Sequence, residues 1–278
     1  MAQKKFQDLD LKDAFLFAAA MEDEETCRIT LQVLLNRKIT KVRVRAEHTM
    51  LYSSDYRSIR LDVYARDEEG DYNVEMQVEN HGNLPKRSRY HQAEMDVASI
   101  LPGTDFNDLK PNYVIFICTF DPFGQGLYQY TFENRCIETG NALGDGTTKI
   151  FLSTKGKNAE AVPQALVHFL QYIENSSEQC VEALQDETVG RLHNRVRALK
   201  KSREWESRYM RFDELLQDAE RVGLNRGMEK GMEKGMEKGQ ERLLTLIDKM
   251  TEAGETEEIK RLAKDADFLQ EMYAKYQV

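Results

Sequence analysis

The hydrophobic pattern is clearest in residues 59–79, where two runs of alternating apolar and polar residues flank a short polar segment. Alternation with period two is typical of β-strands that bury one face. The apolar positions are Ile59, Leu61, Val63 and Ala65 in the first run, and Tyr72, Val74, Met76 and Val78 in the second. The intervening Asp67–Gly70 is polar and ends in glycine, like a hairpin turn. We therefore predict a β-hairpin with strands near residues 58–66 and 71–79.

Helical spacing precedes this hairpin. Apolar residues recur at intervals of three and four over residues 11–18, and again over residues 27–35. Asp23 suits the N-cap of the second helix, and acidic residues follow it in the first turn, where the helix dipole favours them. Alternating valines at 42–44 indicate a short strand before the hairpin.

The segment after the hairpin continues the mixture of helices and strands. A helix is predicted from about residue 86 to 100, and residues 113–120 form a continuous apolar run, as expected for a strand buried on both faces. Residues 127–136 alternate, and residues 149–152 indicate a shorter strand. Up to Phe120 the order is helix, three strands, helix, strand, which indicates an α/β fold.

From about residue 158 the pattern becomes almost purely helical. Pro163 suits the first turn of a helix that continues through residue 173, and a second helical region is predicted over residues 178–222. Later apolar residues indicate that the last helices pack against something. We therefore predict two parts, a domain over residues 1–157 and a helical C-terminal region over residues 158–278.

A four-residue Gly-Met-Glu-Lys repeat lies at 227–239 in the helical C-terminal region, within the sequence GMEKGMEKGMEKGQE of residues 227–241. It places four glycines on one slowly drifting helical stripe: Gly227, Gly231, Gly235 and Gly239. Glycine costs about 1 kcal/mol relative to alanine inside a helix, so four of them call for a reason. Either a partner helix approaches closely along the stripe, or the segment is a charged spacer solvated by Glu and Lys. The sequence leaves both interpretations open.

The apolar runs, the cysteines and the net charge of the chain bear on where the protein acts and on what it binds. No apolar run approaches the roughly 20 residues that span a bilayer, and the start lacks the apolar core of a secretory signal. The four cysteines are widely separated, which predicts neither a zinc site nor a disulfide framework. These features favour the cytoplasm and no membrane. A net charge of −9 argues against indiscriminate coating of nucleic acid but is compatible with a local basic groove.

Two carboxylates in the hairpin are the strongest candidates for chemistry. If the turn is Asp67–Gly70, Arg66 pairs with Asp71 and Asp62 lies directly across from Glu75. Like charges at that spacing, roughly 5 Å, destabilise a sheet unless a hard divalent cation lies between them. The alternative is an ordinary solvated strand face, and a turn one residue different would place the two acids on opposite faces.

The pattern of Asp62, then Glu75-x-Gln77 on an apolar strand, resembles the PD-(D/E)xK nuclease superfamily, and more narrowly the Rpn family of recombination-promoting nucleases and transposases. In that family Glu-x-Gln commonly replaces Glu-x-Lys. The resemblance implies a restriction-endonuclease-like core, a mixed central sheet flanked by helices. It extends to the Gly-Met-Glu-Lys tail and to four further segments: Leu11–Leu35, Lys86–Asp96, Asn112–Cys136 and Asp145–Lys157.

The resemblance also implies the roles of site residues. Asp62 and Glu75 would hold Mg²⁺, or alternatively Mn²⁺, together with the main-chain oxygen of Met76. Gln77 would place the attacking water by hydrogen bonds, because an amide cannot act as a cation. A further acid often joins such sites. The candidates are Asp13, Glu25 and Glu47, each of which could instead be a helix cap or a solvated charge.

Nucleic acid is the expected partner. Candidate contacts surround the hairpin: Arg60, Lys86, Arg87, Arg89, Tyr90 and Gln92. With these features, the resemblance implies a Mg²⁺-dependent endonuclease acting on DNA, and the resemblance alone implies a recombination-promoting or transposase-like role. The rival hypothesis is a catalytically weak or inactive core that oligomerises or binds partners through its C-terminal helices.

Overall fold

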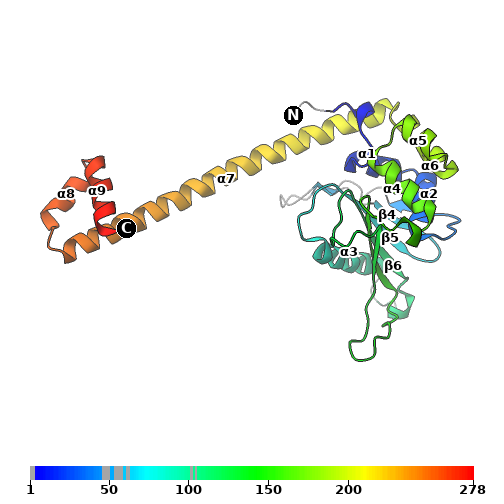
Figure 1. The fold of residues 1–278 in the computed structure, drawn as a ribbon, viewed down its shortest axis with the longest axis horizontal. Helices are drawn as coiled ribbons and strands as arrows, with labels where there is room; N and C mark the ends of the chain where they lie inside the picture. Colours follow the sequence, from blue (N-terminus) through cyan, green and yellow to red (C-terminus); the bar gives the residue numbers. More distant parts are fainter. Residues whose placement is uncertain (1–3, 46–50, 53–58, 61–62, 101–102, 104) are drawn as a thin grey trace. The chain divides into compact units, whose positions relative to one another are not determined.

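The computed structural model describes residues 4–45, 51–52, 59–60, 63–100, 103 and 105–278 (Figure 1). The chain divides into two compact units, Met1–Phe212 and Asp213–Val278. In the part of the chain that the structure describes, no helix combines the length and the apolar character needed to cross a membrane.

A mixed six-stranded sheet is the centre of the first unit, with the strand order β1-β4-β5-β6-β8-β7. Strand β6 is parallel to both of its neighbours, β5 and β8, and the other pairs are antiparallel. A separate pair is formed by β2 and β3. The strands are β1 Arg43–Arg45, β2 Leu51–Tyr52, β3 Ile59–Arg60, β4 Val63–Arg66, β5 Asp71–Gln77, β6 Asn112–Cys118, β7 Gln129–Phe132 and β8 Thr147–Ser153. The predicted α/β fold with a mixed sheet is confirmed.

The hairpin between β4 and β5 has the predicted register. Arg66 pairs with Asp71, and Val63 pairs with Val74. The side chain of Asp67 closes the turn by accepting hydrogen bonds from the amides of Glu69 and Gly70, at 2.8 and 2.7 Å. Of the predicted first strand, β4 covers residues 63–66 and residues 59–60 pair with β2, whereas residues 61–62 lie outside the described residues.

Helices cover both faces of this sheet. Their bounds are α1 Ala14–Met21, α2 Glu24–Leu35, α3 Leu84–Ser99, α4 Gln164–Glu174, α5 Glu178–Leu184 and α6 Glu187–Leu199, with short 3-10 turns at Phe6–Asp8, Phe106–Asp108 and Ala159–Ala161. Asp23 caps α2 as predicted, accepting from the amide of Thr26 at 2.9 Å. Helices α4 and α6 pack against α2, so these helices belong to the same compact unit as the sheet.

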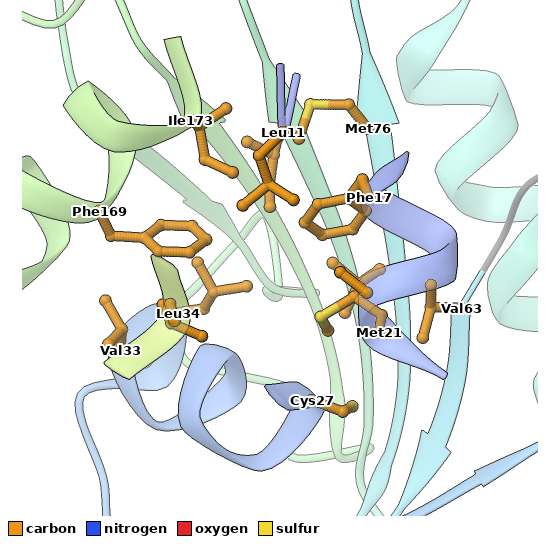
Figure 2. Packing of buried hydrophobic residues seen from close by; sticks show 14 of the residues in the cluster. Leu11, Phe17, Met21, Cys27, Val33, Leu34, Val63, Met76, Phe169 and Ile173 are labelled. Atoms are coloured by element: carbon orange, nitrogen blue, oxygen red, sulfur yellow. The ribbon is translucent and has the colours of Figure 1, made fainter. Parts of the chain in front are cut away.

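The alternation along the strands separates two apolar clusters. Val63 and Met76 contribute to the larger cluster, which also contains Phe17 of α1 and Phe169 of α4 (Figure 2). The opposite face of the sheet packs against α3 in a smaller cluster formed by Leu84, Met95, Val114, Phe116, Cys118, Tyr130 and Phe151. The odd-numbered residues of β5, from Asp71 to Gln77, belong to this second face and are all polar. Strand β5 therefore separates the larger apolar cluster from a polar layer, formed by its odd-numbered residues, that lies beneath α3 beside the smaller cluster.

Helix α7, Arg203–Glu252, begins in the first unit and ends in the second. At its start, Phe212 packs on Phe15 of α1, with ring centroids 5.0 Å apart. In the second unit the end of α7 forms a small core with α8, Ile259–Leu262, and α9, Ala266–Tyr276, joined by the 3-10 turn Thr256–Glu258. The buried members of this core are Leu246, Met250, Leu262, Phe268, Met272 and Tyr273. This confirms that the last helices pack together.

Candidate functional site

Glu75 is the central residue of the polar layer between β5 and α3. The residue is only 6% exposed, because β4 and β6 flank its strand and α3 covers its face. Oxygen Oε1 accepts a hydrogen bond from Gln77 Nε2 at 2.9 Å and forms an ion pair with Arg87. Oxygen Oε2 lies 3.4 Å from Nε2 of His91 and accepts no hydrogen bond from the described residues. One carboxylate oxygen is thus engaged, and the other is buried without a hydrogen-bond donor.

Gln77 ends β5 and points to the same face as Glu75. Its Nε2 donates to Glu75 Oε1 and to the main-chain oxygen of Met76, at 2.9 and 3.0 Å. Its Oε1 accepts from Arg87 Nη1 at 2.9 Å. Because guanidinium can only donate and carboxylate can only accept, these partners fix which end of the amide faces which group. Both N–H groups of Gln77 are therefore occupied.

Arg87 and His91 reach the site from α3. They are four residues apart, so they lie on the same side of the helix. The guanidinium of Arg87 lies over the ring of Phe116, 5.7 Å from its centroid, and Phe116 stacks on Phe151. His91 is 1% exposed and also lies 3.4 Å from Oε2 of Glu94. This helix therefore brings a cation and an imidazole to the carboxylate of Glu75.

The other predicted acids have different positions. Asp62 and Glu47 lie outside the described residues. Asp13 caps α1, where its Oδ1 accepts from the amides of Phe15 and Leu16, and burial raises its pKa. Glu25 pairs with Arg28 and Arg191, and its hydrogen bond with Arg28 lowers its pKa. The geometry thus gives Asp13 a capping contact and Glu25 a network of surface ion pairs.

The predicted nucleic-acid contacts divide between the surface and the interior. Lys86, Arg89 and Tyr90 are exposed on α3. Arg87 instead turns toward Glu75, and Gln92 is buried, donating to Asn112 Oδ1 at 2.6 Å. Arg60 belongs to β3, and its side chain lies outside the description.

Two residues of the polar layer were not singled out by the sequence. His91 fits no nucleophilic triad in the sequence, yet its i, i+4 spacing from Arg87 is a usable signal. Asn73 lies two residues before Glu75 on the same strand face and is fully buried, and neither its oxygen nor its nitrogen has a hydrogen-bond partner among the described residues. Period-two alternation alone could have placed Asn73 beside Glu75.

The donor set of this site fits a hard cation in part. Among the described residues no three His, Cys, Asp or Glu side chains converge as a metal site. Glu75 Oε2, however, is a buried carboxylate oxygen that accepts no hydrogen bond from these residues, and oxygen ligands are what Mg²⁺ prefers. The site can therefore supply one carboxylate ligand from β5.

A surface cleft of about 460 Å³ lies elsewhere, between α4 and the start of α6. Its polar centre is His168, whose Nδ1 lies 2.9 Å from Asp186 Oδ2. Asp186 caps α6 through the amides of Thr188 and Val189. Burial raises the pKa of Asp186, but these hydrogen bonds and that with His168 outweigh it and leave the pKa below its usual value. This pair is explained by helix capping.

The comparisons with known proteins agree with this geometry. A family model described as PD-(D/E)XK nuclease family transposase matches residues 15–222, which is more than half of the chain. Searches of curated proteins and of solved structures give no match. The match spans all six strands of the main sheet, the helices on both of its faces and the Glu-x-Gln pair on β5. The chain belongs to the family of PD-(D/E)XK nuclease family transposases.

Proposed function

We propose that this protein is a Mg²⁺-dependent endonuclease that hydrolyses phosphodiester bonds in DNA, with the recombination-promoting role of the Rpn group. The observation that carries the proposal is the buried carboxylate of Glu75, which has one oxygen without a hydrogen-bond donor among the described residues. Arg87 and Gln77 engage Oε1, whereas a buried oxygen without a hydrogen bond is costly, so Oε2 is the atom of this carboxylate that favours a further cation. The family supplies the reaction class.

The proposed metal ligands are Glu75, Asp62 and the main-chain oxygen of Met76. The hairpin register supports Asp62, since Val63 pairs with Val74 and the predicted pair of Asp62 with Glu75 would come next. When bound, Mg²⁺ would polarise the phosphodiester and lower the pKa of a coordinated water. Gln77 fixes one oxygen of Glu75 by its hydrogen bond, which leaves Oε2 as the oxygen available for a ligand.

The proposed DNA contacts are the exposed side chains of α3 next to the site. Lys86 and Arg89 can neutralise phosphates, and Tyr90, which is about half exposed, can stack on a base. Gln92 is left out of this surface because its amide is bound to Asn112. Affinity through these contacts falls as salt concentration rises.

Cleavage of supercoiled plasmid by the full chain tests the proposal. We expect nicking in Mg²⁺ and none in EDTA, because the proposed metal supplies the activated water. An Asp62→Ala variant should lose the activity while keeping its helical circular-dichroism signal. A folded, DNA-binding protein that cleaves neither plasmid nor single-stranded DNA or RNA in Mg²⁺ or Mn²⁺ would contradict it.

The exposed methionines of α7 favour self-association as an additional property. Met228, Met232 and Met236 are each at least 60% exposed and form a row beside the glycines of the repeat. Such a row can fit as a ridge into the glycine row of a second copy, in the packing class where rows of spacing four interdigitate. Replacing all three methionines by glutamine should shift a dimer toward monomer in light scattering, and a wild-type monomer at high concentration would exclude the pairing.

A further inference from the structure

Gln77 cannot fulfil the role of a lysine at its position, for two independent reasons. An amide carries no charge. In addition, both of its N–H groups already donate, to Glu75 Oε1 and to the main-chain oxygen of Met76. The amide can therefore neither stabilise a developing negative charge nor donate to an attacking water in this arrangement. A positive charge must come from another residue.

We propose that Arg87 of α3 is the cation of this active site, an inference that rests on the proposed nuclease function. Its guanidinium contacts both motif side chains, Glu75 Oε1 and Gln77 Oε1. Phe116 holds it from one side, itself stacked on Phe151. The role of one lysine is thus divided: Gln77 orients the carboxylate, and Arg87 supplies the charge beside the scissile phosphate.

The position of Arg87 predicts effects that distinguish a catalytic cation from a residue that only supports the fold or only binds DNA. Its side chain is about 31% exposed, so the guanidinium is open enough to meet a phosphate while its ion pair stays largely shielded. Because it neutralises Glu75, it also competes with any cation for that carboxylate. Removing its charge should therefore strengthen metal binding and weaken catalysis. A residue that only supports the fold, or only binds DNA, would not give these opposite effects.

The test compares Arg87→Gln and Arg87→Lys with a matched control, Arg66→Gln. Arg66 also pairs with a carboxylate of β5, that of Asp71, and it donates to Ser99 of α3. Asp71 lies four residues before Glu75 on the strand, so this pair is outside the proposed site. We expect Arg87→Gln to lower kcat at saturating plasmid by about 10²–10³-fold. Arg87→Lys should lose roughly tenfold, because it keeps the charge but not the planar fork. Arg66→Gln should keep kcat within about twofold, since a lost pair outside the site leaves the reacting groups in place.

Two further measurements do not depend on turnover. Mn²⁺ binding to the metal-free protein, followed by calorimetry, should tighten about tenfold or more in Arg87→Gln, because a competing charge is gone. Affinity for a short DNA duplex in EDTA, followed by fluorescence anisotropy, should change less than about threefold, since Lys86 and Arg89 remain. Adding Gln77→Lys to Arg87→Gln should restore at least about tenfold in kcat, because the charge returns beside Glu75.

Three results would overturn the assignment. If Arg87→Gln keeps kcat while DNA affinity falls, Arg87 is a DNA contact. If Mn²⁺ binding weakens together with kcat, Arg87 only supports the shape of the site. If the wild type cleaves in a Glu75-dependent manner but adding Gln77→Lys to Arg87→Gln does not restore kcat, the loss in Arg87→Gln is not caused by the loss of positive charge. Failure of the wild type to cleave at all would instead remove the nuclease proposal itself, and this assignment with it.

Discussion

Replacing Glu75 by glutamine is expected to lower the rate of plasmid cleavage by roughly three orders of magnitude, equivalent to about 4 kcal/mol of transition-state stabilisation. The change is nearly isosteric, so it removes the negative charge while leaving the volume of the buried side chain unchanged. Without that charge the proposed metal loses its one carboxylate ligand from β5, and Arg87 loses its ion-pair partner. The rate is measured by the conversion of supercoiled to nicked plasmid in Mg²⁺.

Asp71→Asn is the matched control for this variant. Asp71 lies on the same strand and the same face as Glu75, is similarly buried, and is likewise paired with an arginine, Arg66. It should keep cleavage within about threefold, because its charge lies outside the proposed site. Unchanged circular dichroism establishes that both variants fold. Full cleavage by Glu75→Gln would mean that the reaction occurs elsewhere or that a contaminating nuclease is responsible.

Gly156→Ala should cost about 2–4 kcal/mol in the free energy of unfolding, the largest effect on stability that we expect from adding one methyl group. A Cβ at this position would lie 2.3 Å from Cγ of Tyr128 and 2.6 Å from its main-chain nitrogen. A side chain could rotate away, but the main chain of Tyr128 is held by Asn158 Oδ1 and by the amide of Ser153. Urea unfolding followed by circular dichroism measures the change.

Gly190→Ala provides the control of opposite sign. Gly190 lies inside α6, and an added Cβ would meet nothing within 4 Å. Alanine is favoured over glycine in a helix interior, so this variant should gain about 0.5–1 kcal/mol. A loss of similar size in both variants would show that the close contact at Tyr128 is not the cause.

The hairpin could be predicted because its information is local. Turn chemistry at Asp67–Gly70 and period-two alternation together determine the register, and the structure has Arg66 opposite Asp71 as predicted. Glycine is required at position 70 for a second reason that the sequence does not reveal: a Cβ there would lie 2.7 Å from the main-chain oxygen of Pro111. That contact joins segments about forty residues apart, so no local pattern reports it.

The position of Arg87 next to Glu75 could not be read from the sequence in the same way. Lys86, Arg87 and Arg89 are near neighbours with the same charge, and only the rotation of α3 about its axis decides which one faces the sheet. A strong apolar stripe would have fixed that rotation, but the buried side of α3 includes Ser88, His91 and Gln92. A polar buried face has no signature in hydrophobic periodicity, because hydrophobic periodicity detects apolar residues only.

The packing of α4 and α6 was also hidden from the sequence. Their helical pattern predicted the elements correctly but not their partners. The change near residue 158 from a mixed pattern of strands and helices to an almost purely helical pattern marks a change of secondary structure. The compact units, however, divide after Phe212. Contacts between α2 and the later helices span more than a hundred residues, and they depend on how the whole chain closes.

The parallel and antiparallel neighbours of β5 have a consequence for how the site can adapt. Glu75 and Gln77 lie on an interior strand, and β6 pairs with β5 along its whole length up to Gln77. Their main chain cannot shift without breaking a sheet ladder, whereas Arg87 and His91 are carried by a helix that only packs on that sheet. The proposed active site thus has one side fixed by the sheet and one side formed by a helix that can adjust its position. If the proposed site acts on DNA, accommodation of different DNA shapes is expected to come from α3, so variation in that helix should change substrate choice while the carboxylate of Glu75 keeps its position.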